Sequence, residues 1–405
     1  MTLSDAPPFD VIEISLFGPG LGESLAIHYG GGRWIVVDSC IDPDSGAAAA
    51  LQYFERIGIS CESAVTHVIA THAHDDHIGG LASVLAACTQ ARFVCPVAMV
   101  REPFIALLEV DSELEGLRRS AFREFRQIQK ILEGRKNRHN SLGSYFYGLE
   151  GRTILKNAES VSGPAVEIMA LTPSDTAVQR SLTRLASLYP TQGAKKRFKD
   201  LPNETSLALW VEIEQVSILL GSDVEIGPTH CGWKGVMAWE GRPTSKSEVF
   251  KVAHHGSHTG HHEPMWNEML VDSPISILSP FNSGRHSLPL ESDLHRIALA
   301  SSRTFITVAP TEAKLGGSIR SMTSTLGGVV ENRRVRALTL GHVRLRKHLA
   351  HGAAWEGVLN DPASEIEITR LEDRRAKVES EKRPSPNKSK KRAEERRKNQ
   401  RNKKL

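Results

Sequence analysis

The sequence predicts a mixed fold of the α/β (α+β) class, on three observations. Strand-like and helix-like runs alternate along most of the 405 residues. A chain of this length with 40% hydrophobic residues can bury a large core. Its densest group of metal-binding residue types, in "THAHDDH" at 71–77, directly follows an apolar run. Together these features favour a globular protein in which polar loops leave buried strands.

The N-terminal part of the chain is expected to form strands. One is "VIEISLF" (11–17), and "LAIHYGGGRWIVVDS" (25–39) supplies two more, with three glycines as the hairpin turn. The loop "GPGLGES" (18–24) lies between the first and second of these strands. It is not a dinucleotide-binding fingerprint, because Glu23 stands where the third glycine is required. Further along, "HVIATH" (67–72) is expected as a strand and "IGGLASVLAAC" (78–88) as a helix.

Composition excludes several classes of protein. The five cysteines are scattered without C-x-x-C spacing, which argues against a disulfide framework and a cysteine zinc site. No window has the roughly 20 uninterrupted apolar residues of a membrane span, so no membrane association is expected. The start, "MTLSDAPPFD", lacks the features of a signal peptide. A cytoplasmic location is therefore the expectation.

Positive charge is concentrated at the C-terminal end. Residues 381–405 contain twelve Lys or Arg against three Glu, a net charge of +9, which leaves −5 for the rest of a chain whose total is +4. This segment has almost no apolar residues, so we expect a tail at 371–405 that is disordered or folds only on a partner. Two roles stay open for it: a solubilising end, or an arm that binds a polyanion such as nucleic acid.

The segment His72 to His77 contains three histidines and two aspartates in a loop between a strand and a helix. Imidazoles and carboxylates suit zinc, manganese and iron, and several of them within six residues need little ordering to form a site. A polar turn with a helix cap would need only one of the aspartates. The sequence therefore predicts a metal site here.

This H-x-H-x-D-H segment, preceded by Thr71, resembles the signature of the metallo-β-lactamase fold superfamily. Other parts of the chain resemble the same superfamily: "WIVVDSC" with Asp38, "VSILLGSDVE" with Asp223, and "VFKVAHHGSHT" with His254 and His255. The His-His-Gly-Ser form looks like the hydrolase domain of the bacterial competence DNA-uptake channel and its soluble relatives. "LPNETSLALWVEI", and "SPFNSGRHSLP" with Asn282 and His286, are similar to that subgroup, although Ser287 stands where it usually has proline. The resemblance covers about Phe9 to Val308.

The resemblance implies an αββα sandwich. We expect one hydrolase domain over 1–370, with a helical insertion at about 101–150, followed by the basic tail at 371–405. Within the insertion, apolar residues recur at helical spacing between Pro103 and Leu132, at Phe122, Phe125, Ile128 and Ile131.

The resemblance also implies the ligands of two metal ions. His72 and His74 would bind one ion, Asp76 and His77 a second, and Asp223 would bridge them. Either His254 or His255 would complete the cluster, and His254 is preferred because it stands at the strand end. One or two Zn²⁺ ions are expected, with Mn²⁺ as the alternative.

Catalytic roles follow from the same comparison. Asp76 and His286 are expected to be catalytic, with His286 protonating the leaving group or binding a phosphate, and Asp38 is expected to orient a ligand imidazole. Superfamily members usually have another histidine between the first motif and the bridging aspartate, and "LPNETS" has none. His230 could substitute for it, or could be an ordinary loop residue.

Three functions remain open from the sequence. The first is phosphodiester hydrolysis through a metal-activated hydroxide, with nucleic acid or a nucleotide as substrate. Two basic loops, "GRKNRH" and "AKKRFK" with Phe198 in the second, would suit such a substrate, although either could be a solvated charge run. The second is hydrolysis of a small ester, lactone or thioester. The third is a binding module in which the metal is structural and the tail recruits a partner.

Overall fold

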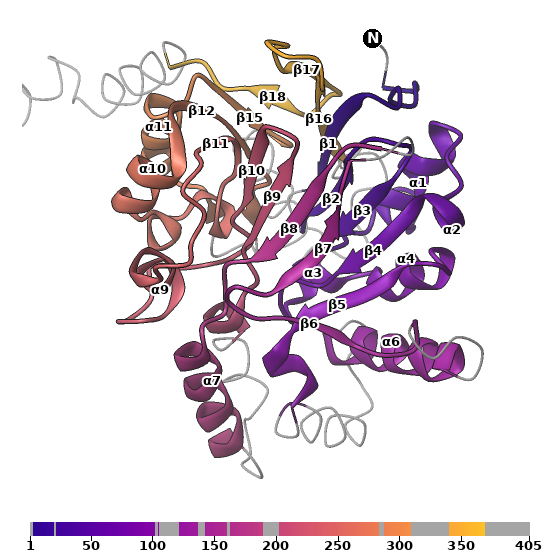
Figure 1. The fold of residues 1–405 in the computed structure, drawn as a ribbon, viewed down its shortest axis with the longest axis vertical. Helices are drawn as coiled ribbons and strands as arrows, with labels where there is room; N and C mark the ends of the chain where they lie inside the picture. The colour runs from indigo at the N-terminus through magenta and orange to yellow at the C-terminus, as the bar shows by residue number, and fades with distance from the viewer. Residues whose placement is uncertain are drawn as a thin grey trace, which may run out of the picture. The chain divides into compact units, whose positions relative to one another are not determined.

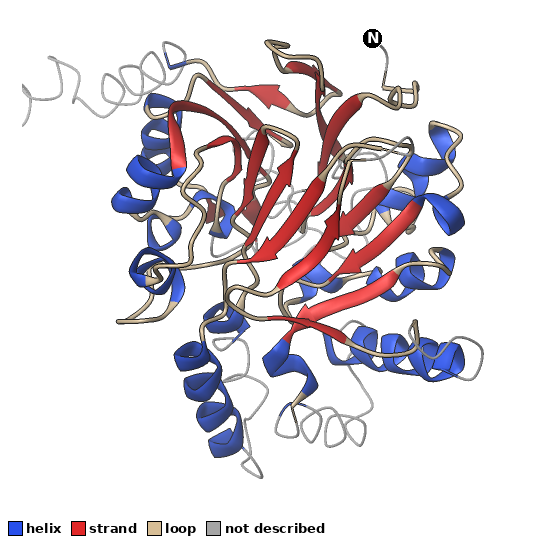
Figure 2. Cartoon of the chain, in the orientation of Figure 1, coloured by secondary structure: helices blue, strands red, loops and turns tan. Residues whose placement is uncertain are grey.

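Two eight-stranded sheets lie face to face, with helices on their outer sides (Figures 1 and 2). The computed structural model describes residues 3–19, 22–101, 104, 121–136, 142–159, 163–188, 202–282, 287–308 and 340–368. The compact unit that contains both sheets is Met1–Glu365; of a second unit, Ile366–Leu405, the first three residues are described. The expected tail, His286 and the loop with Phe198 lie outside the described residues, as do the last three residues of "GRKNRH".

The first sheet combines N-terminal strands with two from the end of the unit. Its order is β17 (Glu356–Leu359), β16 (Gly341–His348), β1 (Val11–Gly18), β2 (Ser24–His28), β3 (Trp34–Val37), β4 (Val65–Ile69), β5 (Arg92–Pro96) and β6 (Phe146–Gly148). Strands β3 to β6 are parallel neighbours. The expected strands at 11–17 and within 25–39 are confirmed, and Gly30, Gly31 and Gly32 form their turn with positive φ.

The second sheet is built from the middle of the chain. Its order is β18 (Ser364–Glu365), β15 (Arg303–Ile306), β12 (Leu270–Leu278), β11 (Ser247–Lys251), β10 (Val216–Leu220), β9 (Leu209–Ile213), β8 (Val166–Ala170) and β7 (Thr153–Asn157). Strands β10, β11, β12 and β15 are parallel neighbours. A separate two-stranded ribbon consists of β13 (Phe281–Asn282) and β14 (Ser287–Leu288).

Helices cover the outer faces of the two sheets (Figure 2). Beside the first sheet are α1 (Ala49–Arg56), α2 (Cys61–Ala64), α3 (Asp75–Ile78), α4 (Leu81–Ala87) and α6 (Ala121–Lys136). The remaining helices are α7 (Asp175–Leu188), α9 (Gly232–Ala238), α10 (Glu263–Met269) and α11 (Glu291–Leu299). Short 3₁₀ turns are η1 (Val97–Val100), η2 (Pro202–Thr205), η3 (His254–Gly256) and η4 (His258–Gly260). Among the described residues, no helix combines the length and apolar character that a membrane crossing requires.

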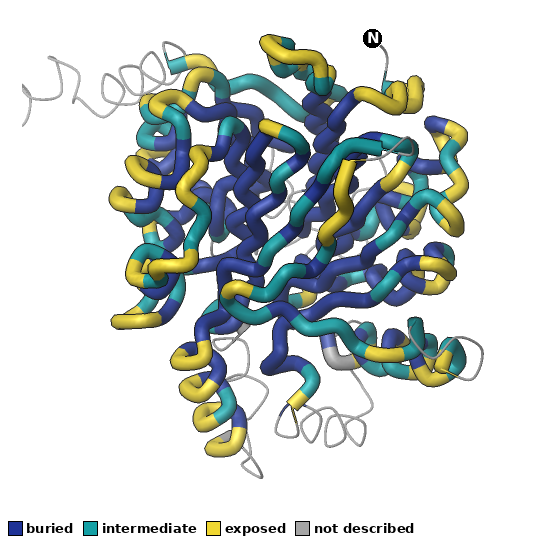
Figure 3. Tube along the Cα trace, in the orientation of Figure 1, coloured by how far each residue is buried: buried dark blue, intermediate teal, exposed yellow. Residues whose placement is uncertain are grey.

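Side-chain alternation along the strands divides the core into two layers. On β1, Ile12, Ile14 and Leu16 point into the core between the sheets, whereas Phe17 belongs to the core between the first sheet and its helices. The strands are accordingly buried while the outer turns of the helices are exposed (Figure 3). This arrangement is the predicted αββα sandwich.

Two expected elements differ in detail. The helix expected at 78–88 begins later, as α4 at Leu81, because Gly80 has a left-handed φ of 85° and separates α4 from the preceding short helix α3. The expected insertion at about 101–150 contains helix α6 but also β6, which pairs with β5 and extends the first sheet. Of the apolar positions expected on this helix, Phe125 and Ile128 are buried and Ile131 is half-buried, whereas the next residue, Leu132, is buried; the side chain of Phe122 is outside the description.

Replacing Phe125 by Ala should destabilise the protein. Its ring is fully buried against Phe93, Phe104 and Tyr145, so the substitution should cost about 3–5 kcal/mol of unfolding free energy, measured by urea denaturation. The matched control is Gln127→Ala on the exposed side of the same helix, with an expected change within about 0.5 kcal/mol. Equal effects of the two substitutions would contradict the docking of α6.

Candidate metal centre

The segment from Thr71 to His77 leaves the carboxyl end of β4 and enters α3. His72 and His77 are buried, His74 precedes the first turn of α3, and Asp76 lies in that turn with a side chain 14% exposed. The carboxyl ends of neighbouring parallel strands meet at one edge of a sheet, which is where ligand-binding loops of such sheets gather. Asp38 at the end of β3 therefore lies beside this segment.

Asp38 is the hydrogen-bond acceptor that orients the segment. Its Oδ1 accepts from the Thr71 backbone N–H (2.7 Å), and its Oδ2 accepts from the Thr71 hydroxyl (2.6 Å) and from Nδ1 of His77 (2.8 Å). Because the Thr71 hydroxyl donates to Asp38, its oxygen is left to accept from Nδ1 of His72 at 3.0 Å. Both imidazoles thus carry a proton on Nδ1, which leaves Nε2 as the nitrogen that can bind a metal ion.

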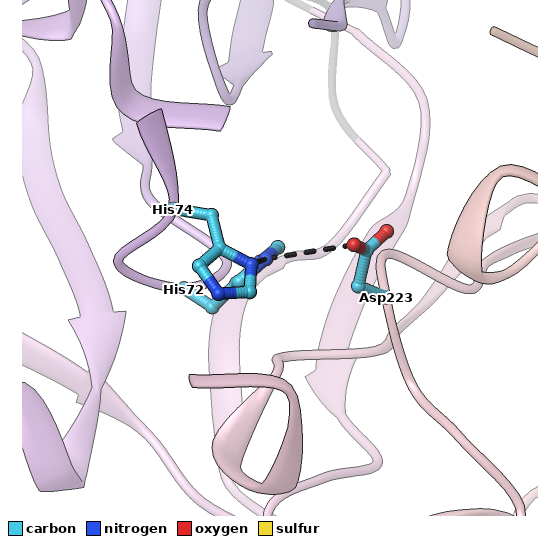
Figure 4. Close-up of side chains that lie close together, drawn as sticks. All are labelled: His72, His74 and Asp223. Atoms are coloured by element: carbon cyan, nitrogen blue, oxygen red, sulfur yellow. Dashed lines mark hydrogen bonds and ion pairs between the residues drawn. The ribbon is translucent and has the colours of Figure 1, made fainter. Parts of the chain in front are cut away.

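Asp223 comes from the opposite sheet and meets these lone pairs. It follows β10 after Ser222, which has a φ of 44°. Its Oδ2 lies 3.6 Å from Nε2 of His72 and its Oδ1 lies 3.4 Å from Nε2 of His77. Figure 4 shows His72 and His74 facing Asp223, and Nδ1 of His74 lies 3.0 Å from Nε2 of His72. A hydrogen bond from the Asp223 N–H to the Ser206 hydroxyl (3.1 Å) fixes the backbone there.

His255, rather than His254, joins this cluster. Nε2 of His255 lies 3.3 Å from Oδ2 of Asp76 and 3.7 Å from Oδ2 of Asp223, while its Nδ1 donates to the Ser279 carbonyl at 3.0 Å. The geometry therefore differs from the preference for His254 drawn from the sequence. Both histidines have positive φ, 48° and 50°, and this turn after β11 directs the second side chain inward.

His254 occupies a more exposed position next to the cluster. Its Nδ1 lies 2.9 Å from the Thr259 hydroxyl and 3.2 Å from Oε1 of Glu225. Its Nε2 lies 3.4 Å from the side-chain nitrogen of Asn203. The side chain of His254 is 18% exposed, whereas His255 is buried. This histidine–glutamate pair can hold or move a proton at the edge of the site.

Among the described residues, three groups of side chains have ligand atoms close enough to hold a metal ion: His72, His74 and Asp223; Asp76, His77 and His255; and Glu23, Asp38 and His77. In the second group, Nε2 of His77 and Nε2 of His255 are buried without a hydrogen-bond partner, and so is Oδ1 of the neighbouring Asp223. Buried polar atoms in proteins nearly always have partners, so these atoms fit metal ligands. The first two groups divide the ligands as expected; that they bind ions stays a prediction.

Electrostatic coupling among these groups is strong. Burial lowers the pKa of His72 well below its ordinary value. Burial acts in the same direction on His77, but the carboxylates of Asp223, Asp76 and Asp38 outweigh it and raise the pKa of His77 well above its ordinary value. Although burial opposes ionisation of Asp223, the imidazoles of His255 and His77 hold its pKa well below the usual range. The cluster thus favours ionised carboxylates facing cations.

Burial and hydrogen bonding act in opposite directions on Asp38. Burial raises the pKa of its carboxyl group above the ordinary value, and the His77 and Thr71 donors partly counteract that shift.

Three other residues were singled out in the sequence, and the structure describes two of them, His230 and Asn282. His230 is on an exposed turn with a φ of 61° and is in none of the three groups found among the described residues. Asn282 is buried in β13 and accepts a hydrogen bond from Ser287 at 3.3 Å. His286 is outside the described residues, so its catalytic role stays a prediction.

The sequence did not reveal several residues next to the cluster. Glu225 is a polar residue without a motif of its own, and Ser206 stands in "LPNETSLALWVEI" without having been assigned a role. Glu23 and Lys251 are buried beneath the ligands, and a signal for each was present. Lys251 interrupts the apolar run "VFKVA", and Glu23 follows a glycine-rich loop between two buried strands.

Comparisons with known proteins support the fold. The family model described as "Metallo-beta-lactamase superfamily" matches residues 18–130. The two facing sheets with their outer helices are consistent with the metallo-β-lactamase sandwich that this match indicates. No match was found among curated proteins.

Similar solved structures include three proteins of low sequence identity. The metallo-beta-lactamase fold protein YhfI from Bacillus subtilis is 11% identical, with 74% of this chain and 96% of that chain covered and a TM-score of 0.37. Zn²⁺-bound PqqB from Methylobacterium extorquens is 12% identical, with 57% and 59% covered and a TM-score of 0.28. A mutant of the CmlA beta-hydroxylase is 15% identical, with 84% and 55% covered and a TM-score of 0.35.

Replacing Asp38 by Asn should weaken metal binding. The amide group would present a donor to Thr71 or His77 in place of an acceptor, so the imidazoles would lose their fixed orientation. We expect zinc affinity to fall roughly 10- to 100-fold in a chelator competition titration. Asn tolerates the left-handed φ of 58° at this position, so the backbone should be retained. The exposed control Asp44→Asn should bind as wild type, and equal affinity in both variants would refute the role of Asp38.

Proposed function

We propose that this protein is a metal-dependent hydrolase that cleaves phosphodiesters in nucleic acid or nucleotides. The observation that carries the proposal is the pair of adjacent ligand groups that meet at Asp223, with unpartnered Nε2 atoms of His77 and His255 directed at carboxylates. His72, His74 and Asp223 would hold one ion, and Asp76, His77 and His255 a second. Asp76, which was expected to be catalytic, would then act mainly as a metal ligand.

The donor set suits zinc, with manganese as the alternative. Imidazole nitrogens and carboxylate oxygens bind both metals, and no cysteine is in the three groups among the described residues. Bound there, such ions would supply Lewis acidity and activate a water near neutral pH. PqqB is a zinc-bound protein, but its likeness to this chain is too low to add support.

Charge balance favours two ions and an anionic substrate. Three buried carboxylates, the partly exposed carboxylate of Asp76 and one buried ammonium surround the site: Glu23, Asp38, Asp223, Asp76 and Lys251. Counted with metal-bound, neutral imidazoles and all four carboxylates ionised, these groups carry a net charge of −3. One divalent ion would leave the site negative, whereas two would leave it at +1. The hydroxide that the ions would activate brings a two-ion centre to zero, so that centre would not repel a phosphodiester anion, whereas a one-ion centre would.

His254 would donate a proton to the leaving group. Its Nδ1 faces Glu225 and Thr259, so its Nε2 is directed toward Asn203 at the partly exposed edge of the site. In the protonated form this nitrogen can donate to a leaving oxygen, and the Asn203 amide can orient the same group. This assignment gives His254 the role that the sequence suggested for His286.

The two neighbouring histidines should respond differently to substitution. Wild-type protein loaded with zinc should hydrolyse bis(4-nitrophenyl) phosphate, and a chelator should abolish the activity. His255→Ala should lose both activity and one zinc ion, because its Nε2 faces Asp76 and Asp223. His254→Ala should keep both ions by mass spectrometry, with turnover reduced about 10²- to 10⁴-fold on a dinucleotide, whose alkoxide leaving group needs a proton.

The same assay distinguishes the alternatives. Loss of zinc in His254→Ala but not in His255→Ala would reverse the assignment of the two histidines. Hydrolysis of a chromogenic carboxylic ester without hydrolysis of the phosphodiester would replace our proposal by a small-ester hydrolase. A zinc-loaded protein inactive on both substrates, single-stranded DNA, RNA and cyclic dinucleotides would leave a metal-stabilised binding module.

Removal of residues 381–405 should separate nucleic-acid binding from catalysis. The segment has a net charge of +9, so its removal should weaken nucleic-acid affinity. The dependence of log affinity on log salt should flatten by roughly 0.7 to 0.9 for each phosphate that the tail neutralises. Hydrolysis of bis(4-nitrophenyl) phosphate should be unchanged. An unaltered affinity and salt dependence would show that the tail is only a solubilising end.

A further inference from the structure

A buried ion pair joins the two sheets beneath the metal centre. Glu23 lies in the loop between β1 and β2 of the first sheet, and Lys251 is the last residue of β11 in the second. The Lys251 ammonium contacts Oε1 of Glu23, and both side chains are 1% exposed. Neither residue belongs to the ligand set expected from the sequence.

This pair touches each loop that supplies the second ligand group. The Glu23 N–H donates to the Asp76 carbonyl at 3.0 Å. Its Oε1 lies 3.7 Å from Nδ1 of His77, and its Oε2 lies 3.6 Å from Nδ1 of His255. The contacts of Glu23 and Lys251 in the described part of the chain include neither His72 nor His74.

Lys251 adds a link to the bridging aspartate. Its Nζ lies 3.5 Å from the Ser222 carbonyl, in the residue before Asp223. The same carbonyl accepts from the His254 N–H at 2.8 Å. The ammonium thereby connects the loop after β10 with the loop after β11, while Glu23 extends the connection to α3.

Stability alone does not account for such a pair. Taking both charges out of water is costly, and apolar residues of similar volume are often equally or more stable at such positions. Glu23 also belongs, with Asp38 and His77, to the third group able to hold a metal ion. The Lys251 ammonium is already the cation bound to that carboxylate, so a metal ion there would have to compete with it.

We propose that the Glu23–Lys251 pair is a positioning unit for the second metal ion: it fixes Asp76, His77 and His255 relative to one another and to Asp223. The inference rests on the proposed metal-dependent function but concerns metal binding, whatever the substrate. Both residues act through the ligands and contact no reacting group. Loss of the pair should therefore weaken binding at the second group more than at the group of His72, His74 and Asp223, which the pair reaches only through the Ser222 carbonyl beside Asp223.

The experiment compares zinc binding in the full-length wild type, in Lys251→Met, and in the double variant Glu23→Gln with Lys251→Met. The double variant is needed because Lys251→Met alone leaves a buried carboxylate without its cation and could fail to fold. Zinc stoichiometry is measured by mass spectrometry at buffered free zinc, and affinity by chelator competition. We expect two ions in the wild type, and a folded double variant that retains one tight ion while the second binds roughly 10- to 100-fold more weakly.

A second buried ion pair provides the matched control. Arg346 donates from Nε to Oε2 of Glu13 at 2.7 Å, and the two side chains are 5% and 0% exposed. The pair lies on the helix-facing side of the first sheet, where Glu13 also accepts from Tyr53. Glu13→Gln with Arg346→Met should change the unfolding midpoint and keep both zinc ions at wild-type affinity.

Three results would overturn the inference. These are wild-type affinity for both ions in the double variant, equal weakening of both ions in it, or the same selective loss in the Glu13 and Arg346 control. A wild type that binds no zinc would overturn the proposed function as well. A selective loss of the second ion in a protein that cleaves no phosphodiester would support the inference and refute only the substrate class.

Discussion

The three hydrogen bonds accepted by Asp38 are the interaction on which the geometry of the candidate metal centre depends. They fix His77 directly and His72 through the Thr71 hydroxyl, so that both rings present Nε2 to the carboxylate of Asp223. Without an acceptor at this position each imidazole could take either tautomer, and half of these forms would direct an N–H at the place where a ligand lone pair is needed. Asp38 can perform this task because its left-handed φ of 58° turns the carboxylate from the end of β3 back toward β4.

The fold makes this arrangement possible by bringing two parallel strand edges together. The ends of β3 and β4 supply Asp38 and the His72–His77 segment, and the ends of β10 and β11 supply Asp223 and His255. Neither sheet holds a complete set of ligands. The apolar core between the sheets, which includes Ile14, Leu16, Ile218 and Val249, therefore determines the separation of the ligands as well as the stability of the domain. Positive φ angles at Ser222, His254 and His255 complete the convergence, as is common at functional sites.

The sequence predicted the parts of the site that are contiguous or follow a strand directly. The His72–His77 segment, Asp38 and Asp223 all come into contact as the motif suggested, because strand ends limit where such residues can lie. The choice between His254 and His255 could not be made in advance, since the two are adjacent and the turn geometry alone determines which points inward. The contact of Glu23 with Lys251 could not be predicted either, because the two residues are far apart in the sequence and belong to different sheets of the sandwich. The glycines at 79 and 80 indicated a break between α3 and α4, but the periodic apolar pattern favoured a continuous helix.

The two ligand groups differ in what holds them in place. The orientation of His72 is set within the first sheet, by Asp38 and Thr71. The orientation of His255 depends on Ser279 after β12, and its distance from Asp76 depends on the ion pair that crosses from one sheet to the other. A small displacement of the sheets would separate Asp76 from His255, which are 3.3 Å apart, and also His72 from Asp223, which are 3.6 Å apart. Binding at either group therefore requires docked sheets, and by mass action an ion bound there must in turn stabilise the docked arrangement.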